Sequence, residues 1–277
     1  MEKTMSTVKP PQMLDVCVDT GVAKAESSAL KLFILAILAG AFIAFAGAGS
    51  NMAAFNLLAD PGTYGLGRMV AGSVFTAGLI MVVLAGGELF TGNVLIIASV
   101  ADKKTTVGKL LRNWGLVYVG NFVGAAFIAF TCFYGGQFAG GEGMLGAITV
   151  KIAAGKVTMP FMKAFVMGIL CNWLVSLGVW MSYSSTEVVG KIFAMFFPIW
   201  VFVTCGFEHC IANMYYIPAG IFAKADFGAL SGVSAEALDA LTWGGMVTNL
   251  IPVTLGNIVG AGVFVALAYW VAFRKAK

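Results

Sequence analysis

Six long apolar stretches run through this chain, and they limit the folds open to it. A helix that crosses a membrane needs about 20 mostly apolar residues, and each stretch is about that long. Hydrophobic residues make up 60% of the 277 residues and charged residues 11%, whereas soluble domains carry about 25% charged residues. We therefore expect an all-α integral membrane protein with six transmembrane helices. The expected spans cover residues 30–48, 70–98, 114–134, 161–183, 192–216 and 250–273.

The lysines and arginines predict the orientation of these spans. Loops on the cytoplasmic side of a membrane are enriched in both residue types. With both termini on one side, that side holds 12 of the 17 lysines and arginines, and the other side holds five. We therefore expect a multi-pass protein of the plasma (inner) membrane with both termini in the cytoplasm. The five residues of the outer side are Arg68, Lys151, Lys156, Lys163 and Lys224.

The first 28 residues are polar and lack the apolar core of a cleavable signal peptide. We expect a cytoplasmic N-terminal segment over 1–28, a transmembrane domain over 29–273 and a cytoplasmic tail over 274–277. The five cysteines are odd in number and form no Cys-x-x-Cys pair. We interpret them as reduced, small apolar residues.

A six-residue motif occurs once in each half of the chain. Residues 120–125 read Gly-Asn-Phe-Val-Gly-Ala and residues 256–261 read Gly-Asn-Ile-Val-Gly-Ala, so five of six positions agree. The halves, 29–137 and 159–273, hold three expected spans each, and the motif lies in the third span of each half. Because three is odd, the second half must insert upside down. The sequence therefore predicts an inverted 3+3 repeat, a plan common among transporters.

The second span of each half is interrupted at a matching place. The interruptions begin at Gly86 and Gly206, and each contains a glutamate followed five residues later by an asparagine. We expect the second and fifth helices to be broken there. Free backbone N–H groups at the start of a half-helix attract anions, and irregular backbone at membrane depth is tolerated only where it is buried in protein or lines a cavity. The two breaks therefore predict an anion site near the middle of the membrane.

Three segments around these breaks resemble signatures of the formate/nitrite transporter family. They are Gly-Gly-Glu-Leu-Phe-Thr-Gly at 86–92, Cys-Asn-Trp-Leu-Val at 171–175 and Gly-Phe-Glu-His-Cys-Ile-Ala-Asn-Met at 206–214. The chain is most similar to the hydrosulfide-channel branch, although Ser-Leu-Gly at 176–178 departs from the family's more usual Cys-Leu-Ala run. The resemblance covers nearly the whole chain. It implies an aquaporin-like protomer, a homopentamer with one pore in each protomer, and transport of small monovalent weak-acid anions such as hydrosulfide, formate and nitrite.

His209 is the single histidine of the chain and lies in the second break. A lone histidine on an apolar face is more often structural, but ionisable residues at mid-membrane depth are usually functional. We therefore favour a functional histidine, whose imidazole can donate a hydrogen bond or a proton to an anion. The resemblance implies that His209 is the central pore residue and that the hydroxyl of Thr91, in the first break, faces it. The alternative for Thr91 is a bond to its own helix backbone.

Other polar residues near the breaks have two interpretations each. For Glu88 and Glu208 we favour a structural role over acid–base chemistry, in which they accept hydrogen bonds from freed N–H groups, with Glu208 also orienting His209. Asn172 either bonds a neighbouring helix or, as the resemblance implies, tunes the histidine. The resemblance also places Lys156 at an outer vestibule, where its charge concentrates anions, whereas the alternative is a solvated or snorkelling lysine.

The resemblance further implies that apolar side chains narrow the pore above and below its centre. A narrow apolar slit is costly for a bare anion and can lose its water. We therefore expect a proton from His209 or from water to let the substrate cross the slit as the neutral acid. The expected constriction residues are Phe75, Leu79, Leu89, Phe90 and Phe202.

The nearest alternative is an aquaporin-like channel for small neutral solutes. Such channels carry paired Asn-Pro-Ala motifs and a filter arginine, whereas this chain has no Asn-Pro-Ala, and Arg68, Arg112 and Arg274 lie at span ends. We expect no enzyme, metal or cofactor, because one histidine and no cysteine–histidine cluster do not suit a zinc or haem site. No P-loop is present, so ATP-driven pumping is not expected, and no nucleic-acid partner is expected either. The sequence does not rank the three anions or distinguish a passive channel from a proton symporter.

Overall fold

The computed structural model of the protein describes residues 7–275. Residues 1–6 of the predicted N-terminal segment and residues 276–277 of the predicted tail lie outside the described part. The described residues contain six helices long and apolar enough to cross a membrane, which confirms the prediction of an all-helical protein with six apolar spans. They are α2 (Ala29–Ala59), α3 (Tyr64–Ala85), α6 (Val107–Tyr134), α8 (Phe161–Ser182), α9 (Val188–Cys205) and the combined helix Trp243–Arg274, which includes α12 (Trp243–Ala261) and α13 (Ala268–Trp270).

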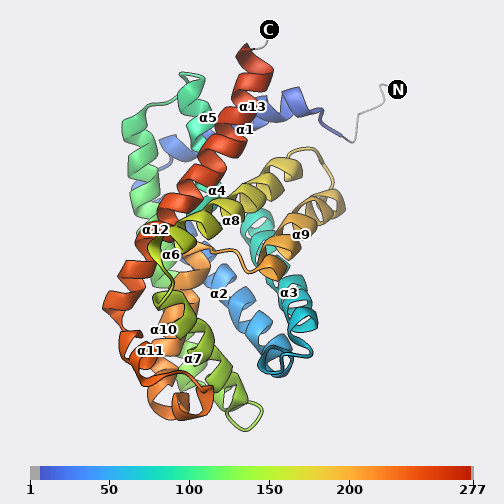
Figure 1. Ribbon diagram of the computed structural model, residues 1–277. Coiled ribbons are helices and arrows are strands. Elements are labelled where there is room, and N and C mark those ends of the chain that lie inside the picture. Colours follow the sequence, from blue (N-terminus) through green and yellow to red (C-terminus); the bar gives the residue numbers. More distant parts are fainter. Residues whose placement is uncertain (1–6, 276–277) are drawn as a thin grey trace.

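The remaining helices cover the two ends of the bundle and the segments between spans. They are α1 (Pro10–Glu26), α4 (Phe90–Asn93), α5 (Ile96–Ala101), α7 (Met144–Val157), α10 (Cys210–Phe227) and α11 (Ala235–Ala240). Helices α1, α5 and α13 lie at one end of the molecule, and α7 and α11 lie at the other (Figure 1). We call these the α1 end and the α7 end.

The first span is longer than predicted. The sequence analysis ended it at residue 48, before two polar residues, whereas α2 continues to Ala59. The two polar side chains, Ser50 and Asn51, are buried within the bundle. The hydroxyl of Ser50 donates a 2.9 Å hydrogen bond to the backbone oxygen of Ala71 in α3. A polar residue therefore interrupts the hydropathy of this span without ending the helix.

Helices α1 and α7 were not predicted, because neither is long and apolar enough to span a membrane. The sequence analysis placed α1 in a polar N-terminal segment and α7 in an outer loop. Helix α1 begins at Pro10, a residue favoured in the first helical turn, and it buries one face that includes Leu14 and Val18. Helix α7 follows Gly143, whose positive φ of 83° suits glycine, and it buries Val150. Both helices therefore pack into the bundle, one at each end.

A cluster of charged residues ties α1 to the end of the last span. Arg274 contacts Asp15 of α1 at 2.6 Å and Asp102, which follows α5, at 3.1 Å. Asp102 also accepts a 3.0 Å bond from the indole nitrogen of Trp270. Burial acts to raise the pKa of Asp102, but the hydrogen bonds from Trp270 and Arg274 and the charges of Arg274 and Lys104 lower it overall. Asp102 therefore remains a carboxylate that bonds the last span.

The repeated Gly-Asn-x-Val-Gly-Ala motif brings helices into very close contact. A Cβ added at Gly124 of α6 would lie 1.9 Å from the backbone oxygen of Ile37 in α2. A Cβ added at Gly260 of α12 would lie 2.2 Å from the backbone oxygen of Ile169 in α8. Small residues allow such close approach, and close packing is a main driving force for helix association in membranes. Each copy of the motif therefore fixes one pair of spans.

Leucine at Gly124 or Gly260 is expected to push these helix pairs apart. Overpacking costs about 1–3 kcal/mol and occasionally more, so we expect each variant to lower the melting temperature in detergent or to prevent folding. The matched control is Gly115→Leu in α6, where an added Cβ meets nothing within 4 Å. Equal melting temperatures for Gly115→Leu and Gly124→Leu would contradict this packing argument.

Candidate functional site

Two short non-helical segments interrupt the bundle, one between α3 and α4 and one between α9 and α10. Helix α3 ends on Gly86 with φ 88°, and α9 ends on Gly206 with φ 75°. Both angles lie in the left-handed region that favours glycine. Residues 87–89 and 207–209 then follow without helical structure before α4 and α10 begin. The backbone groups of these segments need partners inside the protein.

Asn121 of α6 supplies partners for the first segment. Its Oδ1 accepts a 2.9 Å bond from the backbone N–H of Phe90, the first residue of α4. Its Nδ2 donates to the backbone oxygens of Ala36 in α2 at 2.7 Å and of Glu88 at 2.9 Å. A carboxamide can do this because it offers both a donor and an acceptor.

Asn257 of α12 makes the same three bonds at the second segment. It accepts a 2.9 Å bond from the backbone N–H of Cys210, and it donates to the backbone oxygens of Gly168 at 2.8 Å and of Glu208 at 2.9 Å. The sequence analysis had assigned the freed N–H groups to the glutamates. The N–H groups of Phe90 and Cys210 instead go to asparagines, because an ionised carboxylate has no donor for the neighbouring carbonyls.

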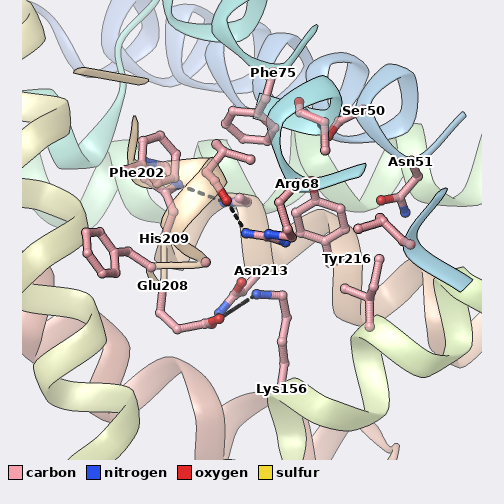
Figure 2. Close-up of a pocket in the computed structure, with 17 residues that line it drawn as sticks. Ser50, Asn51, Arg68, Phe75, Lys156, Phe202, Glu208, His209, Asn213 and Tyr216 are labelled. Atoms are coloured by element: carbon pink, nitrogen blue, oxygen red, sulfur yellow. Dashed lines mark hydrogen bonds and ion pairs between the residues drawn. The ribbon is translucent and has the colours of Figure 1, made fainter. Parts of the chain in front are cut away.

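Each glutamate instead forms an ion pair with a lysine. Lys24 of α1 lies 2.9 Å from Glu88, and Lys156 of α7 contacts both carboxylate oxygens of Glu208, at 2.8 and 3.0 Å. Figure 2 shows Lys156 pointing at Glu208. Lys24 was missed from the sequence, because nothing there indicated a helix that would bring residue 24 to residue 88. Lys156 is half of a buried pair and lies in a helix, not in the expected outer loop.

The asparagines five residues after the glutamates complete these pairs. Asn93 donates to the carboxylate of Glu88 at 2.7 Å and to Oδ1 of Asn113 at 2.9 Å. In the second segment, the corresponding residue donates in the same way. Its two bonds run from Nδ2 of Asn213 to Glu208 at 2.7 Å and to Oδ1 of Asn249 at 2.8 Å.

Thr91 and His209 meet between the two segments. Oγ1 of Thr91 lies 3.0 Å from Nε2 of His209, and both side chains are buried. Nδ1 of His209 accepts a 3.0 Å bond from the backbone N–H of Ala212, so the imidazole caps α10. Because Nδ1 is the acceptor, the neutral ring carries its proton on Nε2 and donates it to Thr91. The hydroxyl proton of Thr91 is then available to another acceptor.

Asn172 of α8 joins the backbone of both segments. Its Nδ2 donates to the backbone oxygens of Thr91 at 3.2 Å and of Asn257 at 2.8 Å. Its Oδ1 accepts a 3.3 Å bond from the hydroxyl of Ser176. Asn172 therefore makes hydrogen bonds between helices, which is the first of the two roles considered for it, and it makes them next to Thr91. In the described residues Glu208 makes no hydrogen bond with His209; its side-chain partners are Lys156 and Asn213.

Two cavities lie on either side of the contact between Thr91 and His209. His209 lines one of them, and Leu89 and Gly92, which flank Thr91 in the sequence, line the other, whereas Thr91 itself lines neither. The cavity at the α7 end measures about 90 Å³ and is shown in Figure 2. Its lining includes Lys156, Glu208 and His209. The cavity at the α1 end measures about 240 Å³, and its lining includes Lys24 and Glu88. Each lysine–glutamate pair therefore borders one cavity.

Four of the five expected constriction residues line these cavities. Phe75 and Phe202 border the α7-end cavity, with ring centroids 5.7 Å apart in an edge-to-face contact. Leu79 and Leu89 border the α1-end cavity. Phe90 lies elsewhere, because its ring packs edge-on against Trp114 and Tyr118 of α6. The structure therefore places Phe90 in the packing of α4 against α6 and not on a cavity wall.

Six apolar spans with a buried threonine–histidine contact between two cavities are the architecture expected of a membrane channel or transporter. The family model for the formate/nitrite transporter matches residues 11–271. The formate channel FocA of Escherichia coli (strain K12) is 41% identical, over 96% of this chain and 94% of FocA. The uncharacterized transporter YrhG of Bacillus subtilis (strain 168) is 37% identical, over 98% of this chain and 96% of YrhG. The chain belongs to the formate/nitrite transporter family, and these relatives are channels and transporters, not enzymes.

Solved structures agree with this assignment. A pentameric formate channel with formate bound matches with a TM-score of 0.78 and 38% identity, over 88% of this chain and 97% of that chain. An FNT family ion channel matches with a TM-score of 0.80 and 30% identity, over 94% and 98%. The fold of the chain is therefore that of channels in this family.

Removing Glu208 is expected to destabilise the protein by leaving Lys156 unpaired. Loss of one partner of a buried ion pair costs about 3–5 kcal/mol, so Glu208→Ala should lower the melting temperature in detergent strongly. Glu88→Ala should cost less, because the side chains of Lys24 and Glu88 are 25% and 11% exposed, against 13% and 5% for Lys156 and Glu208.

The double variant Glu208→Ala/Lys156→Ala tests the origin of that loss. It removes the unpaired charge, so it should recover part of the melting temperature lost in Glu208→Ala. If the double variant melts as low as the single variant or lower, burial of an unpaired lysine is not the cause.

Proposed function

We propose that this chain is a channel for small monovalent weak-acid anions, with formate as the first candidate. The observation that carries this proposal is the contact between Thr91 and His209, which is buried between the two cavities. Formate is supported by relatives named formate channels and by the match to a pentameric formate channel with formate bound. Those relatives also support a homopentamer with one pore in each protomer. Hydrosulfide, which the sequence resemblance favoured, and nitrite are the competing substrates.

We further propose that the protomer is an inverted repeat with a break in the second helix of each half. The contacts at the first segment all have counterparts at the second: Lys24 with Lys156, Glu88 with Glu208 and Asn121 with Asn257. The lysines come from α1 and α7, which lie at opposite ends of the molecule (Figure 1). The proposed repeat unit therefore begins with α1 in the first half and with α7 in the second.

The proposed orientation places the α1 end in the cytoplasm and the chain in the plasma (inner) membrane. The excess of lysines and arginines, 12 against five, supports this direction. The five outer residues of that assignment include Arg68 and Lys156, both of which line the α7-end cavity. The α7-end cavity is therefore the outer vestibule of the proposal.

The proposed pathway runs from one cavity to the other past Thr91 and His209. An anion leaves water at an apolar wall, where an uncompensated charge is costly. The hydroxyl of Thr91 offers it a hydrogen bond, and Nε2–H of His209 offers a second when Thr91 turns away. For the crossing the anion takes a proton either from water or from His209, which can give one only after a second proton on Nδ1, in place of the bond from Ala212, has made it an imidazolium. The neutral acid releases that proton on the far side.

Variants at the centre test this pathway. Thr91→Val removes the hydroxyl at nearly constant volume, and loss of a hydrogen bond to a charged group costs about 1.5–3 kcal/mol. We therefore expect formate flux into proteoliposomes to fall about tenfold or more.

His209→Asn keeps hydrogen bonding without titrating near neutral pH, so it should flatten the rise of flux with falling pH. Wild-type flux and pH profile in His209→Asn would falsify the proton role of His209.

The same proteoliposomes separate the proposal from its alternative. Formate, nitrite and hydrosulfide are compared with water and glycerol, with the membrane potential and the pH gradient clamped separately. Faster anion flux than in protein-free vesicles supports the channel, and the order of the three rates identifies the substrate. Rapid passage of water or glycerol with no anion flux would instead indicate an aquaporin-like channel for neutral solutes.

A further inference from the structure

The two cavities differ in charge, although their lysine–glutamate pairs match. Lys24 and Glu88 border the α1-end cavity, and their charges cancel in an ion pair. Lys156 and Glu208 border the α7-end cavity and cancel in the same way. The α7-end cavity has one additional charged residue in its lining, Arg68. With the histidine neutral, the formal charge of the lining is therefore +1 at the α7 end and zero at the α1 end.

The backbone of the second break holds Arg68 in place. Nε donates to the backbone oxygen of Thr204 at 3.3 Å, and Nη2 donates to the backbone oxygen of Val203. The guanidinium also lies against Gly206, where an added Cβ would be 3.2 Å from Nη2. Figure 2 shows the guanidinium between Phe75 and Lys156 in the cavity. The side chain is therefore fixed at the wall.

Arg68 retains charge and donors for a ligand. A guanidinium has five N–H groups, and the two bonds to α9 use two of them, which leaves three. Over residues 7–275, no carboxylate forms an ion pair with Arg68. The carbonyls at the end of α9 carry only part of a negative charge, so they offset the cation in part. A monovalent anion in the cavity completes the neutralisation.

Asn51 of α2 is a second, independent indication of a ligand. Its side chain borders the same cavity and is 3% exposed. Its Nδ2 has no hydrogen-bond partner among the described residues. An unsatisfied buried donor is destabilising, and an acceptor held in the cavity removes that cost. Figure 2 shows Asn51 on the far side of Tyr216 from His209, so the donor lies away from the centre of the pore.

The α1 end has no counterpart of Arg68. Gly86 and Gly206 differ by 120 in number, as do Glu88 and Glu208, and the same offset pairs Arg68 with Val188. Helices α3 and α9 run antiparallel, because Arg68 bonds Thr204 and Met69 bonds Trp200. The same register places Val188, at the start of α9, level with Gly86. A Cβ added at Gly86 would meet nothing within 4 Å. Val188 itself is 58% exposed and does not line the α1-end cavity, whose charged lining residues are Lys24 and Glu88.

We propose that Arg68 and Asn51 form an anion-binding site in the α7-end cavity, and that this site makes the α7 mouth of the pore bind anions more tightly than the α1 mouth. The inference rests on the proposed channel function. The ligand class is a small monovalent anion with oxygen or sulfur acceptors. Lys156 contributes less to this attraction than the sequence analysis expected, because Glu208 cancels its charge.

Formate influx measured separately from each side tests the site. Proteoliposomes with one orientation, verified by protease protection of an N-terminal tag, allow the half-saturating formate concentration to be measured at either mouth. Charged cleft linings raise the local concentration of counter-ions about tenfold or more. We therefore expect Arg68→Gln to raise half-saturation about tenfold at the α7 mouth and to change it little at the α1 mouth. High ionic strength should reduce this difference.

Further variants keep the test valid if Arg68→Gln does not fold. Arg68→Lys retains the charge and should show a smaller rise, and Asn51→Leu should raise half-saturation at the α7 mouth alone. The matched control is Arg112→Gln, because Arg112 is an exposed arginine that bonds the backbone of Ser27 and lines neither cavity.

The outcomes distinguish this inference from the proposed function. If the wild-type protein carries no anion, the channel proposal fails and this inference fails with it. If the wild type carries formate but folded Arg68→Gln and Asn51→Leu both keep wild-type half-saturation at both mouths, the site is overturned and the channel proposal stands.

Discussion

A break in a membrane helix frees backbone N–H and C=O groups where no water can satisfy them. The non-helical segments 87–89 and 207–209 face this constraint, and Asn121 and Asn257 meet it, each with one accepted and two donated hydrogen bonds to the backbone around one segment. Glycines flank both asparagines. They let α6 approach α2, and α12 approach α8, closely enough for these bonds to form. The short motif therefore joins helix packing and backbone satisfaction in one place.

Once the breaks are fixed, the remaining polar contacts follow from their geometry. Glu88 and Glu208 are held at the breaks, and each needs a cation nearby because an unpaired buried carboxylate is costly. Lys24 and Lys156 supply it from α1 and α7. Neutral pairs also leave no negative charge to repel an anion. At the start of α10, the capping bond of His209 to Ala212 sets the tautomer that faces Thr91.

The sequence predicts those parts of this architecture that depend on local composition or on recognisable motifs. Apolar runs locate the six spans, and the resemblance brought Thr91 and His209 together. The sequence does not predict α1 or α7, because their stability comes from packing against the spans and not from hydropathy. Lys24 was missed for that reason. Phe90 was expected at the pore, but only the rotation of α4 decides that its ring faces α6.

Comparison of the two halves separates residues that hold the fold from residues that differentiate the pore. At an offset of 120, Gly86, Glu88 and Asn93 have identical counterparts in Gly206, Glu208 and Asn213, and these residues hold the two non-helical segments. At the same offset, His209 corresponds to Leu89 and Phe202 to Val82, so these cavity-lining residues differ between the two parts of the chain. Arg68 likewise has a different counterpart at this offset, Val188. Identical halves would give a pore with identical mouths, so any chemistry specific to one position requires a substitution in one half alone. In this chain Arg68, Phe202 and His209 all line the α7-end cavity.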